Sequence, residues 1–221
     1  MELRRTNNTR SLAEVSPILT DRIIRSDKLD SLTAADRDFL VSRGVCVVID
    51  LREAKTRKST VRQDRRFDYY AMPFDVGEWA VVKRQIGNSR EIYRQMPIQY
   101  MYYVDQHGVM ARIMRKILTS SNAVLVMCSH GKDRTGVVMS ILEFLAGVTE
   151  DVIVSDYVAS SVNLFAAHGT NSSLLFYEAK PEVFRRFLGL FRRKYGDAES
   201  YLRTIGLSDT EVRKLKQKVC R

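Results

Sequence analysis

The 221-residue sequence lacks the features that define several classes of protein. Its three cysteines are far apart and form no Cys-x-x-Cys pair, which excludes a disulfide framework and a typical zinc site. No run approaches the ~18 apolar residues that span a bilayer, and residues 1–8 are too polar for a signal peptide. With only four prolines and no repeats, the chain has no obvious linker. We therefore expect one cytoplasmic domain that covers residues 1–221.

Charge is the most unusual property of the composition. Lysine and arginine outnumber aspartate and glutamate by 36 to 26, which gives a net charge of +10. This excess favours polyanionic partners, such as an anionic membrane surface, inositol phosphates, phosphoproteins or nucleic acid. No zinc finger, aromatic RNP motif or heptad-linked basic region supports the last of these, so we expect no nucleic-acid partner.

Short apolar runs alternate with longer helical patterns along the chain. The runs at residues 45–49 and 123–127 are short and apolar throughout, and the first is mostly β-branched, which is typical of strands covered on both faces. Residues 23–25 and 67–72 are further strand candidates. We expect helices at 33–43, 78–87, 98–118 with a break near 107–108, 133–146, from 149, and after the capping box of Ser208 and Glu211. The alternation predicts an α/β fold, with a small, largely parallel central sheet flanked by helices and a helical C-terminal part.

The second apolar run leads directly into Cys128, at the place where α/β sheets bind their ligands. The helix expected from residue 133 directs its N-terminus, with free N–H groups and partial positive charge, toward the same place. Lys132 and Arg134 add positive charge. These features favour the thiolate, which is the nucleophilic form of cysteine, and they also bind a phosphate dianion. We therefore interpret residues 128–134 as a phosphate-binding loop with Cys128 as nucleophile, rather than as the surroundings of an inert buried cysteine.

Other residues of the loop suit the same chemistry. Gly131 allows the sharp turn that brings backbone N–H groups inward. Arg134 can hold two phosphoryl oxygens with its planar guanidinium, and Thr135 can donate its hydroxyl to the cysteine sulfur. Cysteine and arginine six positions apart occur often by chance in an arginine-rich chain. The preceding strand, the glycine, the Arg-Thr-Gly run and the buried helix beyond it make the pattern specific.

At this point the sequence resembles the protein tyrosine phosphatase superfamily. The run from Cys128 to Gly136 matches the signature Cys-x-x-Gly-Lys-Asp-Arg-Thr-Gly, which belongs to a branch of tyrosine, dual-specificity and phosphoinositide phosphatases of an atypical, bacterial-like type. Looser similarities follow the family's order: Asn8-Thr9-Arg10, Arg25-Ser26, Asp50-Leu51-Arg52, Asp156-Tyr157 and Tyr201-Leu202.

The resemblance implies a cysteine-phosphatase fold and a reaction that needs no metal or other cofactor. It also implies substrate contacts by the residues around the nucleophile, namely Ser129, His130, Gly131, Lys132 and Thr135. Two positions depart from the pattern. Met127 stands where the superfamily usually has histidine, and His130 stands where the branch often has alanine.

Hydrolysis of a phosphate ester also needs an acid that protonates the leaving oxygen. Asp133 lies inside the loop beside Arg134, and the resemblance implies that it can serve as this acid. Asp75 follows a strand candidate, where related enzymes carry a loop aspartate, and is otherwise a turn or cap residue. We favour Asp133, and both residues remain candidates at this point.

The expected reaction is phosphate monoester hydrolysis through a phosphocysteine intermediate, on phosphotyrosine or phosphoserine proteins, on phosphoinositides, or on both. The basic segment 55–66 suits a multiply phosphorylated headgroup or a membrane surface if it flanks the site, and is otherwise a solvated loop. Four aromatic residues either line a cleft or belong to the core: Tyr69, Tyr70, Phe74 and Trp79. Two alternatives stay open, a catalytically silent phosphate-binding module and a soluble inositol-polyphosphate phosphatase.

Overall fold

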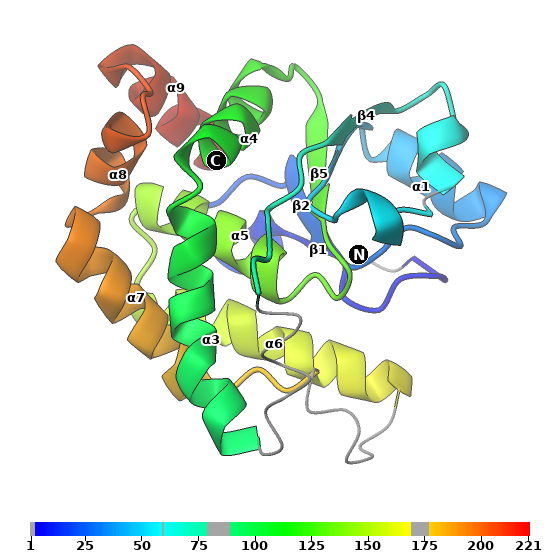
Figure 1. Cartoon of the computed structure of the whole chain (residues 1–221). Helices are drawn as coiled ribbons and strands as arrows, with labels where there is room; N and C mark the ends of the chain where they lie inside the picture. The colour runs from blue at the N-terminus through cyan, green and yellow to red at the C-terminus, as the bar shows by residue number, and fades with distance from the viewer. Residues whose placement is uncertain (1–2, 59, 79–88, 169–176) are drawn as a thin grey trace.

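The computed structural model describes residues 3–58, 60–78, 89–168 and 177–221 and has one sheet flanked by helices (Figure 1). The strands are β1 (Arg10–Ser11), β2 (Ile23–Ser26), β3 (Val45–Asp50), β4 (Asp68–Ala71) and β5 (Ala123–Met127). They lie in the order β1-β2-β5-β3-β4. The short β1 pairs antiparallel with β2, and the other pairs are parallel. The predicted α/β class with a largely parallel sheet is therefore confirmed.

The helices occupy most of the second half of the chain. They are α1 (Ala34–Ser42), α3 (Ser89–Val104), α4 (His107–Thr119), α5 (Asp133–Leu145), α6 (Glu150–His168), α7 (Pro181–Tyr195), α8 (Ala198–Thr204) and α9 (Asp209–Val219). Short 3-10 turns lie at Leu12–Glu14, Ala54–Thr56 and Thr60–Gln63. The capping box predicted for Ser208 and Glu211 is present at the start of α9. None of the helices in the described ranges combines the length and the apolar character needed to cross a bilayer.

Two helical predictions differ from the structure in detail. The expected helix at 98–118 is a pair, α3 and α4, and the chain leaves the first at Asp105, two residues before the predicted break. The first helix also begins earlier than predicted and carries Pro97 in its interior. The helix expected at 78–87 lies almost entirely outside the described residues, as does Trp79.

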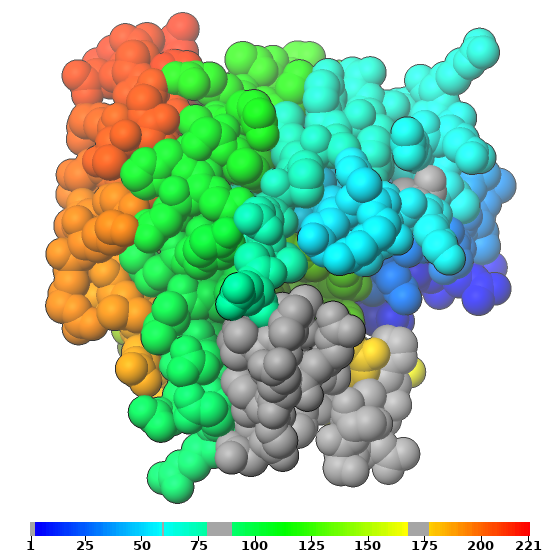
Figure 2. All heavy atoms as spheres, viewed as in Figure 1, coloured from blue at the N-terminus to red at the C-terminus, as the bar shows by residue number. Residues whose placement is uncertain are grey.

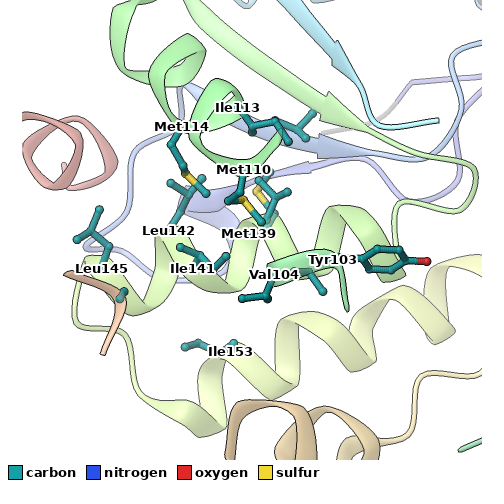
Figure 3. Packing of buried hydrophobic residues seen from close by; sticks show 14 of the residues in the cluster. Tyr103, Val104, Met110, Ile113, Met114, Met139, Ile141, Leu142, Leu145 and Ile153 are labelled. Carbon is teal, nitrogen blue, oxygen red and sulfur yellow. The ribbon is translucent and has the colours of Figure 1, made fainter. Parts of the chain in front are cut away.

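Alternating side chains of the strands enter two hydrophobic cores. Val124 and Val126 of β5 join the larger core with α4, α5 and the C-terminal helices. Their neighbour Leu125 belongs to the smaller core beneath α1. Met110 of α4 and Met139 of α5 meet in the larger core (Figure 3). Because both faces are covered, β5 is apolar throughout, as a parallel strand in the middle of a sheet requires.

The carboxyl ends of three strands meet at one edge of the sheet. Met127, the last residue of β5, lies opposite Ser26 at the end of β2 and opposite Asp50 at the end of β3. The next residue in the chain is Cys128. The fold therefore places the predicted nucleophile at the centre of the edge where ligands of α/β sheets bind.

Candidate active site

Cys128 begins a loop that connects β5 to α5. Only 2% of the residue's surface is exposed, so Cys128 is buried, and it is not among the residues that line the cavity next to the loop. The loop turns at Gly131 and enters α5 at Asp133. The N-terminus of this buried helix, with its free N–H groups, therefore follows the loop directly, as the sequence predicts.

Gly131 is required at the turn for two independent reasons. Its φ of +64° lies in the left-handed region, which side chains other than glycine rarely adopt. A Cβ at this position would lie 2.7 Å from three backbone atoms, the nitrogen of Asp27 and the carbonyl carbon and oxygen of Ser26. The loop therefore packs directly on the backbone that follows β2.

Two side chains from the start of the chain hold consecutive carbonyls of the loop. Asn8 Nδ2 donates to the carbonyl of His130 at 2.9 Å, and Arg25 Nη2 donates to the carbonyl of Gly131 at 2.6 Å. A trans peptide is planar and its N–H points away from its C=O. These two bonds therefore turn the N–H groups of Gly131 and Lys132 to the opposite side, which is the orientation that an anion cradle requires.

A network of buried charges supports Arg25. Its Nη1 pairs with Asp156, whose other carboxylate oxygen accepts from Arg10 Nε at 2.6 Å. Burial opposes ionisation of Asp156, but Arg25 and Arg10 outweigh it and hold the pKa of this carboxyl below its ordinary value. Burial, followed by the charge of Asp156, raises the pKa of Glu143 well above its ordinary value. Removing one partner of a buried ion pair such as Arg25 and Asp156 typically lowers the free energy of unfolding by about 3–5 kcal/mol.

Arg134 spans the loop from the first turn of α5. Its Nη1 donates to the carbonyl of Leu51, just after β3, and its Nη2 donates to Ser129 Oγ, both at 3.2 Å. These contacts fix the guanidinium over the loop and leave it partly exposed to a cavity of about 230 Å³. The residues that line this cavity are Glu53, Thr56, Val76, Met96, Gln99, Tyr100, Tyr103, Ser129, His130, Asp133 and Arg134.

Asp133 also faces this cavity, next to Arg134. Its Oδ1 accepts a hydrogen bond from the hydroxyl of Tyr100 at 2.6 Å, and Tyr100 in turn meets the hydroxyl of Tyr157 at 2.9 Å. The side chain of Asp133 is 26% exposed. Its carboxyl is therefore oriented by a buried tyrosine pair and is still open to a ligand in the cavity.

Asp75, the other candidate acid, lies elsewhere. It is exposed, and it is not part of the lining of the cavity. Its carboxylate accepts from the backbone N–H of Gly77 at 2.9 Å and from the hydroxyl of Tyr102 at 2.8 Å. The bond from Gly77, followed by the bond from Tyr102, lowers the pKa of Asp75. The structure thus brings Asp133 and Arg134 together and gives Asp75 the turn-stabilising contacts of a cap residue.

The surroundings of Lys132 and Thr135 differ from those that the sequence predicts. Lys132 is 2% exposed and does not line the cavity; its ammonium donates to the carbonyl of Glu178 at 2.9 Å and lies 3.6 Å from Asp133 Oδ1. The hydroxyl of the buried Thr135 has no hydrogen-bond partner among the described residues, and in particular does not bond to Cys128. Within the described ranges, no three His, Cys, Asp or Glu side chains gather where they could hold a metal ion.

The sequence matches the tyrosine phosphatase family over residues 1–221. The chain belongs to this family. It is 29% identical to a tyrosine-protein phosphatase of Nostoc commune over an alignment of 219 positions, which covers 90% of this chain and 74% of that protein. It is 26% identical to the triple specificity protein phosphatase PtpB of Mycobacterium tuberculosis, over 95% of each chain.

One wall of the cavity in this tyrosine phosphatase family member was not predicted as part of the site. It consists of one stripe of α3, formed by Met96, Gln99, Tyr100 and Tyr103. The spacing of three or four residues was the available signal, but such a stripe is equally typical of a helix that faces a core. The three predicted cleft aromatics that the structure describes, Tyr69, Tyr70 and Phe74, do not line the cavity. Phe74 is fully buried, the hydroxyl of Tyr69 bonds to Asp50, and Tyr70 lies under the ammonium of Lys116.

The basic segment 55–66 approaches the site at one end. Thr56 lines the cavity, and the described cationic residues of the segment do not. Arg66 is instead paired with Asp64 and Asp38, both at 2.6 Å. The segment that begins with Asp50-Leu51-Arg52 is anchored in the protein, because the buried guanidinium of Arg52 bonds to the carboxylates of both Asp50 and Asp30.

Proposed function

We propose that this protein hydrolyses phosphate monoesters through a phosphocysteine on Cys128, and that phosphotyrosine in proteins is its principal substrate. The observation that carries the proposal is the shared cavity. Arg134 and Asp133 both line the space above the loop that begins at Cys128, and the walls of that space include Tyr100 and Tyr103. The aromatic walls suit a phenolic ester, whose ring can pack against them.

The reaction follows from the placement of these groups. The sulfur of Cys128 attacks phosphorus in line, so that the S–P bond forms as the bond from phosphorus to the leaving oxygen breaks. The loop N–H groups and the Arg134 guanidinium stabilise the charge on the remaining phosphoryl oxygens. Asp133 gives its proton to the leaving oxygen, then takes a proton from the water that attacks the phosphocysteine. Phosphate leaves and the thiolate is restored.

Asp133 is the better candidate for this acid and base. It faces the cavity beside Arg134, whereas Asp75 does not. The hydrogen bonds from Gly77 and Tyr102 lower the pKa of Asp75, which disfavours the protonated form that an acid catalyst needs. The contact from Tyr100 keeps Asp133 in one orientation, as proton transfer to a bound ester requires.

The choice of phosphotyrosine rests on the walls of the cavity and on the relatives. Proteins named tyrosine-protein phosphatase and triple specificity protein phosphatase match nearly the whole chain. Neither Lys132 nor the cations of segment 55–66 line the cavity, so the support for a multiply phosphorylated headgroup is weaker. The exposed cations of that segment, Lys55 among them, still suit contact with an anionic membrane surface.

The proposal is tested with Cys128→Ser, Asp133→Asn and Asp75→Asn on para-nitrophenyl phosphate. We expect Cys128→Ser to abolish turnover, and Asp133→Asn to reduce it about 10²–10⁴-fold while it flattens the basic limb of the pH profile. Asp75→Asn is the matched control and should stay near wild type. Turnover retained in Cys128→Ser would refute the mechanism, and a flattened limb in Asp75→Asn alone would reverse the assignment of the acid.

Substrate class is tested on the same enzyme with phosphotyrosine and phosphoserine peptides, phosphoinositide vesicles and soluble inositol phosphates. The highest kcat/KM is expected for phosphotyrosine peptides. Preference for the vesicles would favour a phosphoinositide phosphatase, and preference for soluble inositol phosphates would favour an inositol-polyphosphate phosphatase. Binding of all ligands without release of phosphate would identify a silent phosphate-binding module.

A further inference from the structure

A second hollow lies between α3 and the start of α7. It has a volume of about 380 Å³ and is lined by Arg90, Tyr93, Arg94, Lys180, Glu182, Val183 and Arg186. Four of these side chains are cationic and one is a carboxylate. We call this set of residues the basic hollow. None of them takes part in the reaction described above.

The positive charge of the basic hollow is only partly neutralised by the protein. Arg94 contacts Glu91 at 3.1 Å, and Lys180 contacts Glu178 at 3.6 Å. Arg90 and Arg186 have no carboxylate partner among the described residues, and both are exposed. Like charges that converge in this way repel one another and lower stability. An anion bound in the hollow would remove this cost.

Lys180 stands at a position where a cation is unfavourable. It is the N-cap residue of α7, and the partial positive charge at a helix N-terminus disfavours a lysine there. Its ammonium also lies over the ring of Tyr93 at 4.5 Å, which holds it at the hollow. The charge of Lys180 therefore destabilises the helix, but it is well placed to bind an anionic ligand in the hollow.

The basic hollow is joined to the active site by the chain segment 177–180. At one end, the ring of Tyr177 packs edge-on against His130 of the loop, with centroids 5.1 Å apart. In the middle, Glu178 accepts from Lys132 through its carbonyl and from Tyr93 through its carboxylate. At the other end, Lys180 lines the hollow. Three residues of extended chain cover about 10 Å.

The helix α3 gives a similar distance between the basic hollow and the catalytic cavity. Tyr93 lines the basic hollow and Tyr100 lines the catalytic cavity, and at about 1.5 Å per residue the two positions are on the order of 10 Å apart along the axis. An extended peptide advances about 3.3 Å per residue. A substrate residue three or four positions from the phosphorylated residue would therefore reach the hollow.

We infer that the basic hollow binds an acidic or phosphorylated side chain of a phosphoprotein substrate, three or four residues from the phosphotyrosine held in the catalytic cavity. This inference rests on the proposed function, because it assigns the substrate that the same site accepts. Arginine suits the role, since its planar guanidinium can bind a carboxylate or a phosphate with two parallel hydrogen bonds.

The test compares phosphotyrosine peptides that carry glutamate at three or four residues from the phosphotyrosine, on either side, with otherwise identical peptides that carry glutamine. The wild type should have a KM about three- to tenfold lower for at least one glutamate peptide, which is the range expected for two partly exposed ion pairs. The preference should weaken as salt is raised. The double substitution Arg90→Gln with Arg186→Gln should remove it.

The matched control is Arg193→Gln with Arg213→Gln, which removes two exposed charges outside the hollow and should leave the preference intact. Para-nitrophenyl phosphate separates this inference from the proposed function, because it is too small to reach the hollow. Its turnover should be equal in wild type and both double variants. If the wild type does not hydrolyse it, the proposed function fails.

If the wild type hydrolyses it but all peptides have equal KM, or the preference survives in the Arg90 and Arg186 variant, the inference about the hollow is wrong. A variant that loses turnover of phosphoinositide vesicles and keeps the peptide preference would equally overturn it, since the hollow would then serve a membrane surface.

Discussion

Substitution of Gly131 by alanine should disable the enzyme while a second glycine only five residues away tolerates the same change. At Gly131 the new Cβ would lie 2.7 Å from backbone atoms of Ser26 and Asp27. Ordinary carbon contacts are about 3.5–4.0 Å, so the loop must move away from β2 by roughly 1 Å. At Gly136 the nearest atoms to a new Cβ are Arg25 Nη2 and Tyr157 Cδ2, both at 3.6 Å, which is an ordinary contact.

The size of the effect follows from these contacts. The left-handed backbone of Gly131 costs about 1–2 kcal/mol for another residue, and the overlap adds about 1–3 kcal/mol. The sum of about 2–5 kcal/mol lowers the melting temperature of a chain of this size by roughly 4–20 °C. A displacement of about 1 Å at the loop also misplaces the phosphate, for which a loss of about 10²-fold in kcat is expected. Gly136→Ala lies in a helix, where alanine is favoured by up to about 1 kcal/mol.

Thermal unfolding and turnover of para-nitrophenyl phosphate measure both effects. Gly131→Ala should remain folded at 20 °C with a lower melting temperature and about 10²-fold lower kcat. Gly136→Ala should keep wild-type kcat and an equal or higher melting temperature. The reasoning would be refuted if Gly131→Ala had wild-type kcat, or if Gly136→Ala lost as much activity as Gly131→Ala while both remained folded.

Two further predictions concern the supports of the fold. Asn8→Ala removes the hydrogen bond to the His130 carbonyl, so the loop N–H groups lose their fixed orientation; kcat on para-nitrophenyl phosphate should fall about tenfold with little change in KM, and an unchanged kcat would show that Asn8 does not orient the loop. Glu211 has a pKa lowered to about 2, first by its hydrogen bond from Arg115. Because this is below the ordinary value of 4.5, its stabilising effect is present above about pH 4.5 and is lost as the pH falls toward 2. Urea unfolding of Glu211→Gln should therefore lose less stability between pH 5 and pH 3 than the wild type does, and an equal loss in both would contradict the assignment.

The elements around the active site are those that the sequence predicts best, because their signals are local. The strand at 123–127 is bounded as predicted, since five consecutive apolar residues are typical of a strand covered on both faces. The helix predicted at 133–146 is α5. The glycine of the loop was predicted from its ability to turn, and its φ of +64° confirms this reason. At Gly136, by contrast, the space beside the residue is large enough for a methyl group.

The rest of the site depends on contacts between segments that are distant in sequence. Asn8 and Arg25 reach the loop only because β1, β2 and β5 are neighbours in the sheet, and strand order cannot be deduced from periodicity. The choice between Asp133 and Asp75 as the acid likewise cannot be made from the sequence. Both are single aspartates next to expected elements, and their difference lies in which one faces the cavity. That is a property of how α3 packs across the edge of the sheet.

The loop and the residues that support it therefore have different roles. The signature from Cys128 to Arg134 contains the groups that we propose to react with and bind phosphate, but a loop of seven residues cannot fix its own peptide planes. That task falls to Asn8 and Arg25, and Arg25 can perform it only while Asp156 balances its charge in the interior. An uncharged residue in place of Asp156 would leave two buried guanidinium groups facing each other without their shared partner, which burial makes far more costly than on the surface. We therefore infer that the pair of Asp156 and Arg25 supports the proposed phosphate-binding loop, although neither residue lines the cavity beside Asp133 and Arg134.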